Sequence, residues 1–146
     1  MKRHPALAPL SRDHHHALVL ARRLREASAA TVSAEADRFL GHWREEERLH
    51  FRLEDEILLP AYAVFGDLQQ PPIIRMLLDH VLIRRDAELL SREPSLQLLH
   101  ALGVTLEAHV RLEEREVFPL IEDAIPAPEL QALGERLRQG LRAQES

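Results

Sequence analysis

A weak internal repeat around two histidines limits the folds that this chain can adopt. It reads HFRLEDEILLP from His50 and HVRLEEREVFP from His109. Both copies contain a His, an Arg-Leu-Glu triplet, a further acidic residue and a proline ten residues after the His. The segments ahead of them also correspond loosely, since an Asp-His pair precedes a helical apolar pattern at residues 13–14 and 79–80. The repeat indicates two helical hairpins, each with a His on its first helix and His-x-x-x-Glu on its second.

The spacing of apolar residues indicates an all-α chain, because no stretch alternates with period two. Prolines, serines and glycines divide it into four long helical segments, at about residues 9–29, 33–65, 72–91 and 95–124. Short connections make neighbouring helices antiparallel, so we predict an up-and-down antiparallel four-helix bundle over about residues 7–125. A short fifth helix, at about residues 128–143, is expected to lie across one end or one side of the bundle.

The same prolines, serines and glycines predict where these helices begin, end and bend. Ser33 and Ser95 are the expected N-caps of the second and fourth segments, and Gly66 is expected to end the second. Pro60 and Pro119 lie inside those two segments. Because proline lacks an N–H and clashes with the preceding turn, we expect a kink or a break at each.

Composition excludes several classes of protein. The 146 residues are 45% apolar and 29% charged, which is typical of one folded domain, here predicted to span residues 1–146. A net charge of −5 argues against a general nucleic-acid binder. The absence of cysteine excludes disulfides, thiolate metal sites and a thiol nucleophile. No apolar run approaches the ~20 residues of a membrane span, and the start of the chain does not resemble a signal peptide, so we expect a cytoplasmic protein.

Nine histidines make a metal site worth testing, and the helical faces indicate which of them point inward. At about 100° per residue, His50 and Glu54 lie in the middle of the apolar stripe of the second segment. His109 and Glu113 occupy the same place in the fourth segment. Glu47 also falls on the stripe of the second segment, so it is a further inward carboxylate.

In the first segment, only one of three adjacent histidines can face the core. His14 lies on the apolar stripe, and His15 is the alternative if the helix is rotated. His80 lies among apolar residues of the third segment. Glu114 is about 140° from the inward face of the fourth segment and is expected to face solvent. The remaining histidines are expected at the surface, with one of them on the rim of the bundle: His4, His15, His16, His42 (rim) and His100.

Four imidazoles and at least two carboxylates are thus directed at one bundle axis. Unpaired buried carboxylates cost of the order of several kcal/mol each, and four imidazolium groups would repel one another. A cation of charge two or three pairs the carboxylates and takes the lone pairs of neutral imidazoles. Nitrogen and oxygen ligands without sulfur suit iron, manganese, zinc or nickel. Six or seven ligands exceed the needs of one tetrahedral zinc, so two metals bridged by Glu54 and Glu113 fit the count better.

At these residues the sequence resembles the hemerythrin-like family, also called the HHE cation-binding domain, over about residues 7–125. The resemblance rests on SRDHHHAL, HFRLEDEILLP, LLDHVLIRR and HVRLEEREVFPLIE. It implies a four-helix up-and-down bundle that holds a non-haem di-iron centre, about two irons per chain, with other divalent metals able to occupy the site in purified protein. It also implies metal-binding roles for His14, His50, Glu54, His80, His109 and Glu113.

The chain departs from the oxygen-carrying members of that family at two positions. Where their third helix has a second His one turn after the first, this chain has Arg84. Their fourth-helix carboxylate follows the His by five residues, whereas Glu113 follows it by four. One ligand position is therefore expected to be either empty or filled by an additional carboxylate, with Glu47 as the inward candidate and Glu46 as its alternative. Arg84 either directs its charge at the site, where it would hold an anion, or extends outward.

We therefore expect a metal-binding protein that binds or senses oxygen, iron or a related small redox molecule. The alternative is a di-iron redox enzyme, or an iron-donating repair protein, acting on peroxide, nitric oxide or oxygen, so enzymatic activity stays an open question. A metal-free phosphotransfer bundle, with His15 or His16 as the acceptor, is a third interpretation. The expected partner is dioxygen or another small diatomic or peroxide ligand, with no nucleic acid or membrane. A sensory output would need a separate protein partner.

Overall fold

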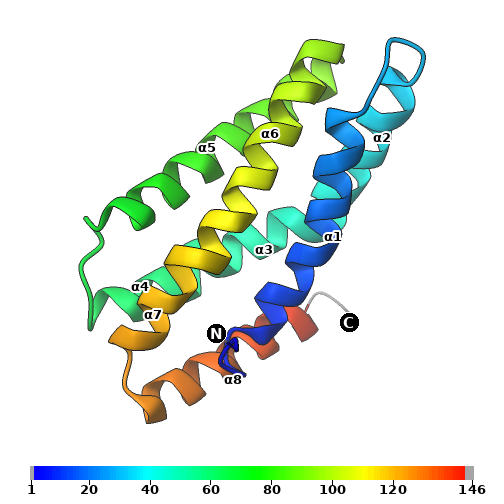
Figure 1. The fold of residues 1–146 in the computed structure, drawn as a ribbon. Coiled ribbons are helices and arrows are strands. Elements are labelled where there is room, and N and C mark those ends of the chain that lie inside the picture. Colours follow the sequence, from blue (N-terminus) through cyan, green and yellow to red (C-terminus); the bar gives the residue numbers. More distant parts are fainter. Residues whose placement is uncertain (1, 144–146) are drawn as a thin grey trace.

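The computed structural model describes residues 2–143, and helices are the only regular elements within that range. Four long helical rods form an up-and-down bundle, which confirms the predicted fold class (Figure 1). The elements in chain order, with π-helical turns marked η, are α1 (Ala8–Arg25), α2 (Val32–His42), η1 (Trp43–Glu47), α3 (Arg48–Leu53), η2 (Glu54–Leu58), α4 (Leu59–Ala63), α5 (Pro71–Arg92), α6 (Leu96–Leu112), η3 (Glu113–Val117), α7 (Phe118–Ala124) and α8 (Ala127–Ala143).

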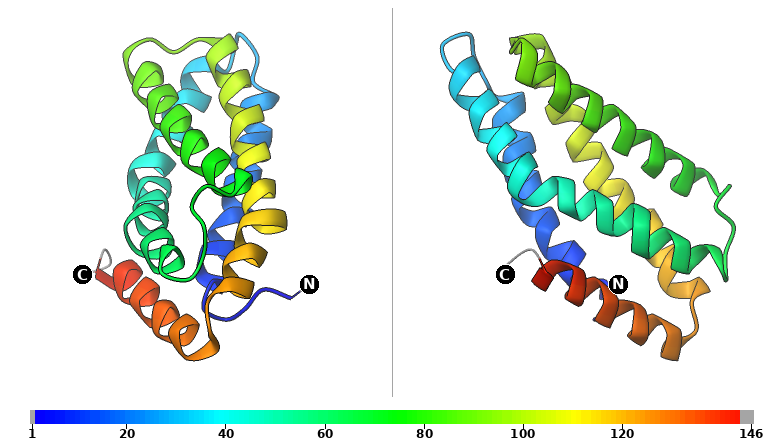
Figure 2. Two further views of the ribbon diagram at one scale, coloured as in Figure 1. Left: turned by 90° about the vertical axis from the view of Figure 1, so that its left-hand side faces the viewer. Right: turned by 180° about the vertical axis from the view of Figure 1, so that it is seen from behind.

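The second rod runs continuously from α2 to α4, and the fourth runs from α6 to α7. Helix α8 crosses the end of the bundle that also carries the N-terminus, as Figure 2 shows from two sides. In residues 2–143 we find no helix with both the length and the apolarity needed to cross a membrane.

The apolar core divides into two clusters along the bundle. One is built around Leu10, Met76 and Val117, and α8 covers it at the end of the bundle. The other is built around Ala17 and Ile83 and extends toward the far ends of the rods. The polar residues described below lie in the layer between these clusters, so apolar packing holds that layer from both sides.

The two prolines do not break their helices. The Leu59 N–H donates to the carbonyl oxygen of Glu54, five residues earlier, and the rod then continues as α4 with Pro60 in its first turn. The fourth rod repeats this arrangement with a π turn from Glu113 and with Pro119 in the first turn of α7. A missing N–H is tolerated in a first turn. Of the kink or break predicted at each proline, the break is therefore absent, and a widened turn precedes the proline instead.

The expected helix boundaries are confirmed at two positions and wrong at one. The Ser95 side chain caps α6 by accepting the Leu98 N–H at 3.1 Å, and the chain turns out of the second rod at Gly66, whose N–H donates to the Tyr62 carbonyl. Ser33 is not an N-cap, because α2 begins one residue before it and Thr31 takes the cap position without a side-chain bond to the helix.

Gly103 allows α6 to lie close to α1. A Cβ at this position would lie 2.8 Å from the carbonyl oxygen of Ala21 and 3.0 Å from the backbone nitrogen of Arg25. We expect Gly103→Ala to lower the free energy of unfolding by about 1–3 kcal/mol, because overpacking against rigid backbone outweighs the ~1 kcal/mol by which alanine favours a helix over glycine.

The matched control is Gly41→Ala in α2, where a Cβ would meet no atom within 4 Å. This variant should gain about 0.5–1 kcal/mol of stability. Urea unfolding of both variants measures the difference, and a stabilised Gly103→Ala protein would contradict the close approach of α1 and α6.

Candidate metal centre

Four histidines and two glutamates meet in the polar layer between the apolar clusters, and each rod contributes one of the histidines. All six side chains are buried, with at most 3% of any residue exposed. We call this group the central cluster; it consists of His14 (α1), His50 (α3), Glu54 (η2), His80 (α5), His109 (α6) and Glu113 (η3). The structure thus brings together six of the seven residues predicted to bind metal, and their role as ligands stays a prediction.

The first half of the central cluster joins the histidines of the first hairpin to both glutamates. Candidate ligand atoms of His14, His50, Glu54 and Glu113 all lie within 4.8 Å of one another. His14 Nε2 lies 2.8 Å from Glu113 Oε1, and His50 Nε2 lies 3.2 Å from Glu54 Oε2. His50 Nε2 is also 3.7 Å from Glu113 Oε1.

The second half joins the histidines of the other hairpin to the same two glutamates. His80 Nε2 lies 3.1 Å from Glu54 Oε1, and His109 Nε2 lies 3.0 Å from Glu113 Oε2. His80 Nε2 is 3.5 Å from Glu113 Oε2. Glu54 and Glu113 therefore each turn one oxygen toward each half, which is the geometry of a carboxylate shared between two sites.

A second carboxylate holds the opposite side of every imidazole ring. The Nδ1 atoms contact acids of a neighbouring rod: His14 with Glu114 (2.6 Å), His50 with Asp13 (3.0 Å), His80 with Asp55 (2.7 Å) and His109 with Asp79 (3.2 Å). An ionised carboxylate only accepts hydrogen bonds, so Nδ1 donates and a neutral ring keeps its lone pair on Nε2, toward the central cluster. Carboxylate–histidine pairs of this kind orient metal-binding histidines.

These four outer acids form a closed ring around the bundle. In chain order, the acid of each rod holds the histidine of the next rod, and the acid of the fourth rod holds the histidine of the first. None of these acids was predicted to hold a histidine, although each directly precedes or follows a member of the central cluster in the sequence. That adjacency, an acid beside each inward residue on all four rods, is the signal that could have found them.

Two predictions about neighbouring residues are wrong. Glu114 does not simply face solvent, because its carboxylate bonds His14 and the Ser11 hydroxyl. His42 is not a rim residue but is buried, with 8% exposed. Both errors arise from π turns, since Glu114 lies inside η3 and η1 separates His42 from His50. A π turn contains more residues than an α turn, so the rotation of 100° per residue does not hold across it.

The remaining candidates lie at the edge of the central cluster. Glu47 is buried as predicted, but its Oε2 accepts a hydrogen bond from His42 Nε2 at 2.8 Å. Its proposed substitute, Glu46, is exposed and is not part of the central cluster. Arg84 donates to Asp55 at 2.8 Å, so its charge supports the acid behind His80.

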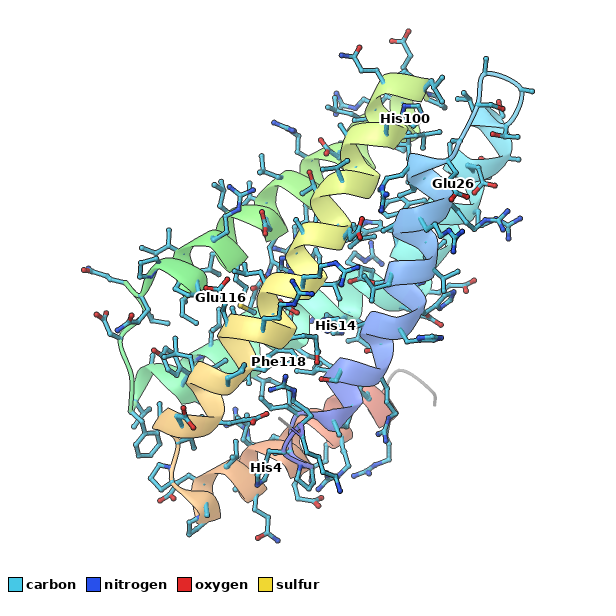
Figure 3. All side chains as sticks on the ribbon, in the orientation of Figure 1. His4, His14, Glu26, His100, Glu116 and Phe118 are labelled. Atoms are coloured by element: carbon cyan, nitrogen blue, oxygen red, sulfur yellow. The ribbon has the colours of Figure 1, made fainter. Side chains whose placement is uncertain are left out.

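Aromatic rings enclose the central cluster. The Phe51 ring stacks on His80 with centroids 4.1 Å apart and meets His109 edge-on. Phe118 stacks on His14 at 5.5 Å, and these two residues lie side by side between α1 and the fourth rod (Figure 3). These rings cover imidazoles that are at most 3% exposed, so they help to keep bulk water from the cluster.

The unpaired atoms of the central cluster fit a metal ion. Within the described part of the chain, six buried atoms of the central cluster have no hydrogen-bond partner: Nε2 of His50, His80 and His109, both side-chain oxygens of Glu54, and Oε2 of Glu113. Two ligands at about 2.1 Å from a metal and at right angles to each other lie about 3.0 Å apart. The shortest contact of each histidine with a glutamate, 2.8 to 3.2 Å, has this spacing.

Without a metal ion, protons must supply the positive charge. Burial lowers the pKa of His80, but its hydrogen bond to Asp55 and the nearby carboxylates of both cluster glutamates raise it to about 11. Burial opposes the charged forms of His14 and His109 in the same way, and their neighbouring carboxylates raise both pKa values to about 9. Burial raises the pKa of Glu113, yet the charge and hydrogen bond of His109 hold it well below its usual range. The cluster is therefore a strong cation site.

A family model described as the hemerythrin HHE cation-binding domain matches residues 6–121. The matched span contains the whole central cluster and all four outer acids. Comparison with curated proteins and with solved structures finds no match.

We expect loss of an outer acid to weaken metal binding without removing a ligand. Asp79→Asn should reduce metal affinity about 10- to 100-fold, because the amide no longer fixes the His109 ring through a charged acceptor. Asp86→Asn is the matched control, since Asp86 is a buried acid of the same helix that bonds Arg85 instead of a histidine. Competition with a chelator measures both affinities, and equal losses would contradict the role of Asp79.

The metal-free protein should lose stability as the pH rises. His14 and His109 have pKa values of about 9 in the folded protein, against about 6.5 in the unfolded chain. Their protonation therefore stabilises the fold fully below pH 6.5, and this stabilisation is lost as the pH rises through about 9. We expect the melting temperature of metal-free protein to fall between pH 7 and pH 10. Metal-loaded protein, whose imidazoles are neutral, should show no such fall below pH 9. If the melting temperatures of the two forms fell in parallel as the pH rises, protonated histidines would not be the source of positive charge in the metal-free cluster.

Proposed function

Because the chain belongs to the hemerythrin HHE cation-binding family, we propose that its central cluster holds two non-haem iron ions and that the protein binds or senses dioxygen or a related small redox molecule there. The observation that carries this proposal is the sharing of Glu54 and Glu113 between two halves, each completed by two histidines. If the central cluster held a single metal ion, the donor atoms of one half would be left without a cation.

The donor count supports two ions. Each half offers two imidazole nitrogens and one oxygen from each shared glutamate, which makes four protein ligands. Two bridging glutamates from opposite rods, with one histidine from each of the four rods, resemble the way helical bundles hold pairs of iron or manganese ions. A six-coordinate ion would keep positions open for water or for a small exogenous ligand.

The donor chemistry supports iron over the alternatives. Histidine and carboxylate ligands with open positions are typical of non-haem Fe(II), whereas a structural zinc site is closed by four ligands. A buried centre of this kind is suited to redox chemistry, because the outer acids fix the imidazoles while Phe51 and Phe118 exclude water. When bound, a pair of irons would supply the electrons and the open positions that a redox-active diatomic molecule requires.

Burial of the central cluster favours a small ligand. No cluster residue exposes more than 3% of its surface. Dioxygen, nitric oxide and peroxide are small enough to pass between packed side chains during ordinary fluctuations. A bulky organic substrate would have to displace a rod of the bundle. This supports small-molecule binding or sensing as the primary function and keeps a redox enzyme of small substrates as its closest alternative.

The proposal is tested by the metal content and optical spectrum of protein from iron-supplemented cells. We expect about two irons per chain and a near-ultraviolet charge-transfer band that changes on adding dioxygen, peroxide or nitric oxide. Glu113→Ala should lose most of the iron and several degrees of melting temperature, because metal binding is linked to folding.

His15→Ala is the matched control, because His15 is exposed and adjacent to a cluster histidine. This variant should keep both irons and the band. One metal per chain in the unmodified protein, or zinc without a band, would contradict the di-iron proposal. A spectral change that reverses when dioxygen is removed distinguishes binding from consumption of the ligand by an enzyme.

A further inference from the structure

A second group of nitrogen and oxygen donors lies outside the central cluster, where α1 faces the second rod. His16 Nδ1 lies 2.9 Å from Glu46 Oε2, and His42 Nδ1 lies 3.0 Å from the same oxygen. The two imidazole rings meet edge to face at 4.6 Å, and the candidate ligand atoms of the three residues all lie within 4.8 Å of one another. We call His16, His42 and Glu46 the surface trio.

His42 is the residue that makes the surface trio more than a surface ion pair. Its side chain is only 5% exposed, and its Nδ1 is buried without a hydrogen-bond partner, although Glu46 is near. Its other nitrogen, Nε2, donates to the buried carboxylate of Glu47 at 2.8 Å. A neutral His42 therefore turns a lone pair toward the Glu46 oxygen, and two acceptors that face each other need a cation between them.

The bonding of His42 repeats that of the core histidines. There, one ring nitrogen is held by an outer carboxylate and the other faces the glutamates of the central cluster. Here Glu47 takes the place of the outer acid, and the free Nδ1 points into the surface trio. This explains why the buried carboxylate of Glu47 bonds His42.

The surroundings of the surface trio favour a cation that keeps water ligands. The three residues line an open depression of about 420 Å³, together with the acids Asp37 and Glu45. The two arginines of this depression are paired with Glu35, with N–O distances of 2.8 Å for Arg23 and 3.7 Å for Arg38. The side chains of His16 and Glu46 are about half exposed, so water has access to the donors.

We propose that His16, His42 and Glu46 form a surface site for a divalent first-row transition-metal ion. Two imidazole nitrogens and one carboxylate oxygen, with water in the remaining position, are a ligand set that Zn²⁺ adopts in proteins. Glu47 positions the His42 ring and is not itself a ligand. The surface trio shares no residue with the central cluster, so this site does not depend on what the core holds.

The test is equilibrium dialysis against Zn²⁺ with quantitation of zinc per chain, supported by titration calorimetry. Because the core also has donors for zinc, the readout is the difference between the unmodified protein and its variants. We expect His16→Ala and Glu46→Gln each to bind one zinc fewer per chain, or to bind that zinc at least 10-fold more weakly. Both side chains are exposed, so unchanged melting temperatures should accompany the loss.

Two matched controls separate ligation from general charge. His15→Ala removes the neighbouring exposed imidazole, and Glu45→Gln removes an acid that lines the same depression. Both should bind as much zinc as the unmodified protein. Equal stoichiometry and affinity in the unmodified protein, His16→Ala and Glu46→Gln would overturn the proposal and identify His42 as an imidazolium held between Glu46 and Glu47.

Discussion

The sharing of two buried glutamates among four histidines is the interaction on which the rest of this bundle depends. Glu54 and Glu113 are fully buried, so their charges must be balanced inside the protein. The histidines supply that balance only if a proton or a metal ion lies between the donors. The outer acids, the stacked phenylalanines and the two apolar clusters all serve to hold this layer in register.

The backbone is adapted to the same requirement. Both shared glutamates stand at the first position of a π turn, and a proline follows each turn in the next α-helical segment. A π turn contains one residue more than an α turn, so it shifts the helix face on which later side chains lie. Such turns are often found at functional sites, and here the repeat around His50 and His109 places one in each hairpin.

Much of this arrangement could be predicted from the sequence, because apolar periodicity reports which face of a helix is buried. The four rods and the inward positions of His14, His50, His80 and His109 follow from that periodicity. The failures at His42 and Glu114 have one cause, since regular α-helical rotation was assumed across π turns. The outer acids were not predicted, because a carboxylate bonded to an imidazole of another rod produces no periodic pattern in the sequence. Their partners are set by tertiary packing alone.

Whether two metal ions share Glu54 and Glu113 can be tested with an anomalous difference map from crystals of the iron-loaded protein, collected at the iron absorption edge. We predict two peaks about 3.5–4 Å apart, one beside His14 and His50 and the other beside His80 and His109, with both glutamates between them. A single peak in this layer, or iron only outside it, would contradict the shared two-metal centre.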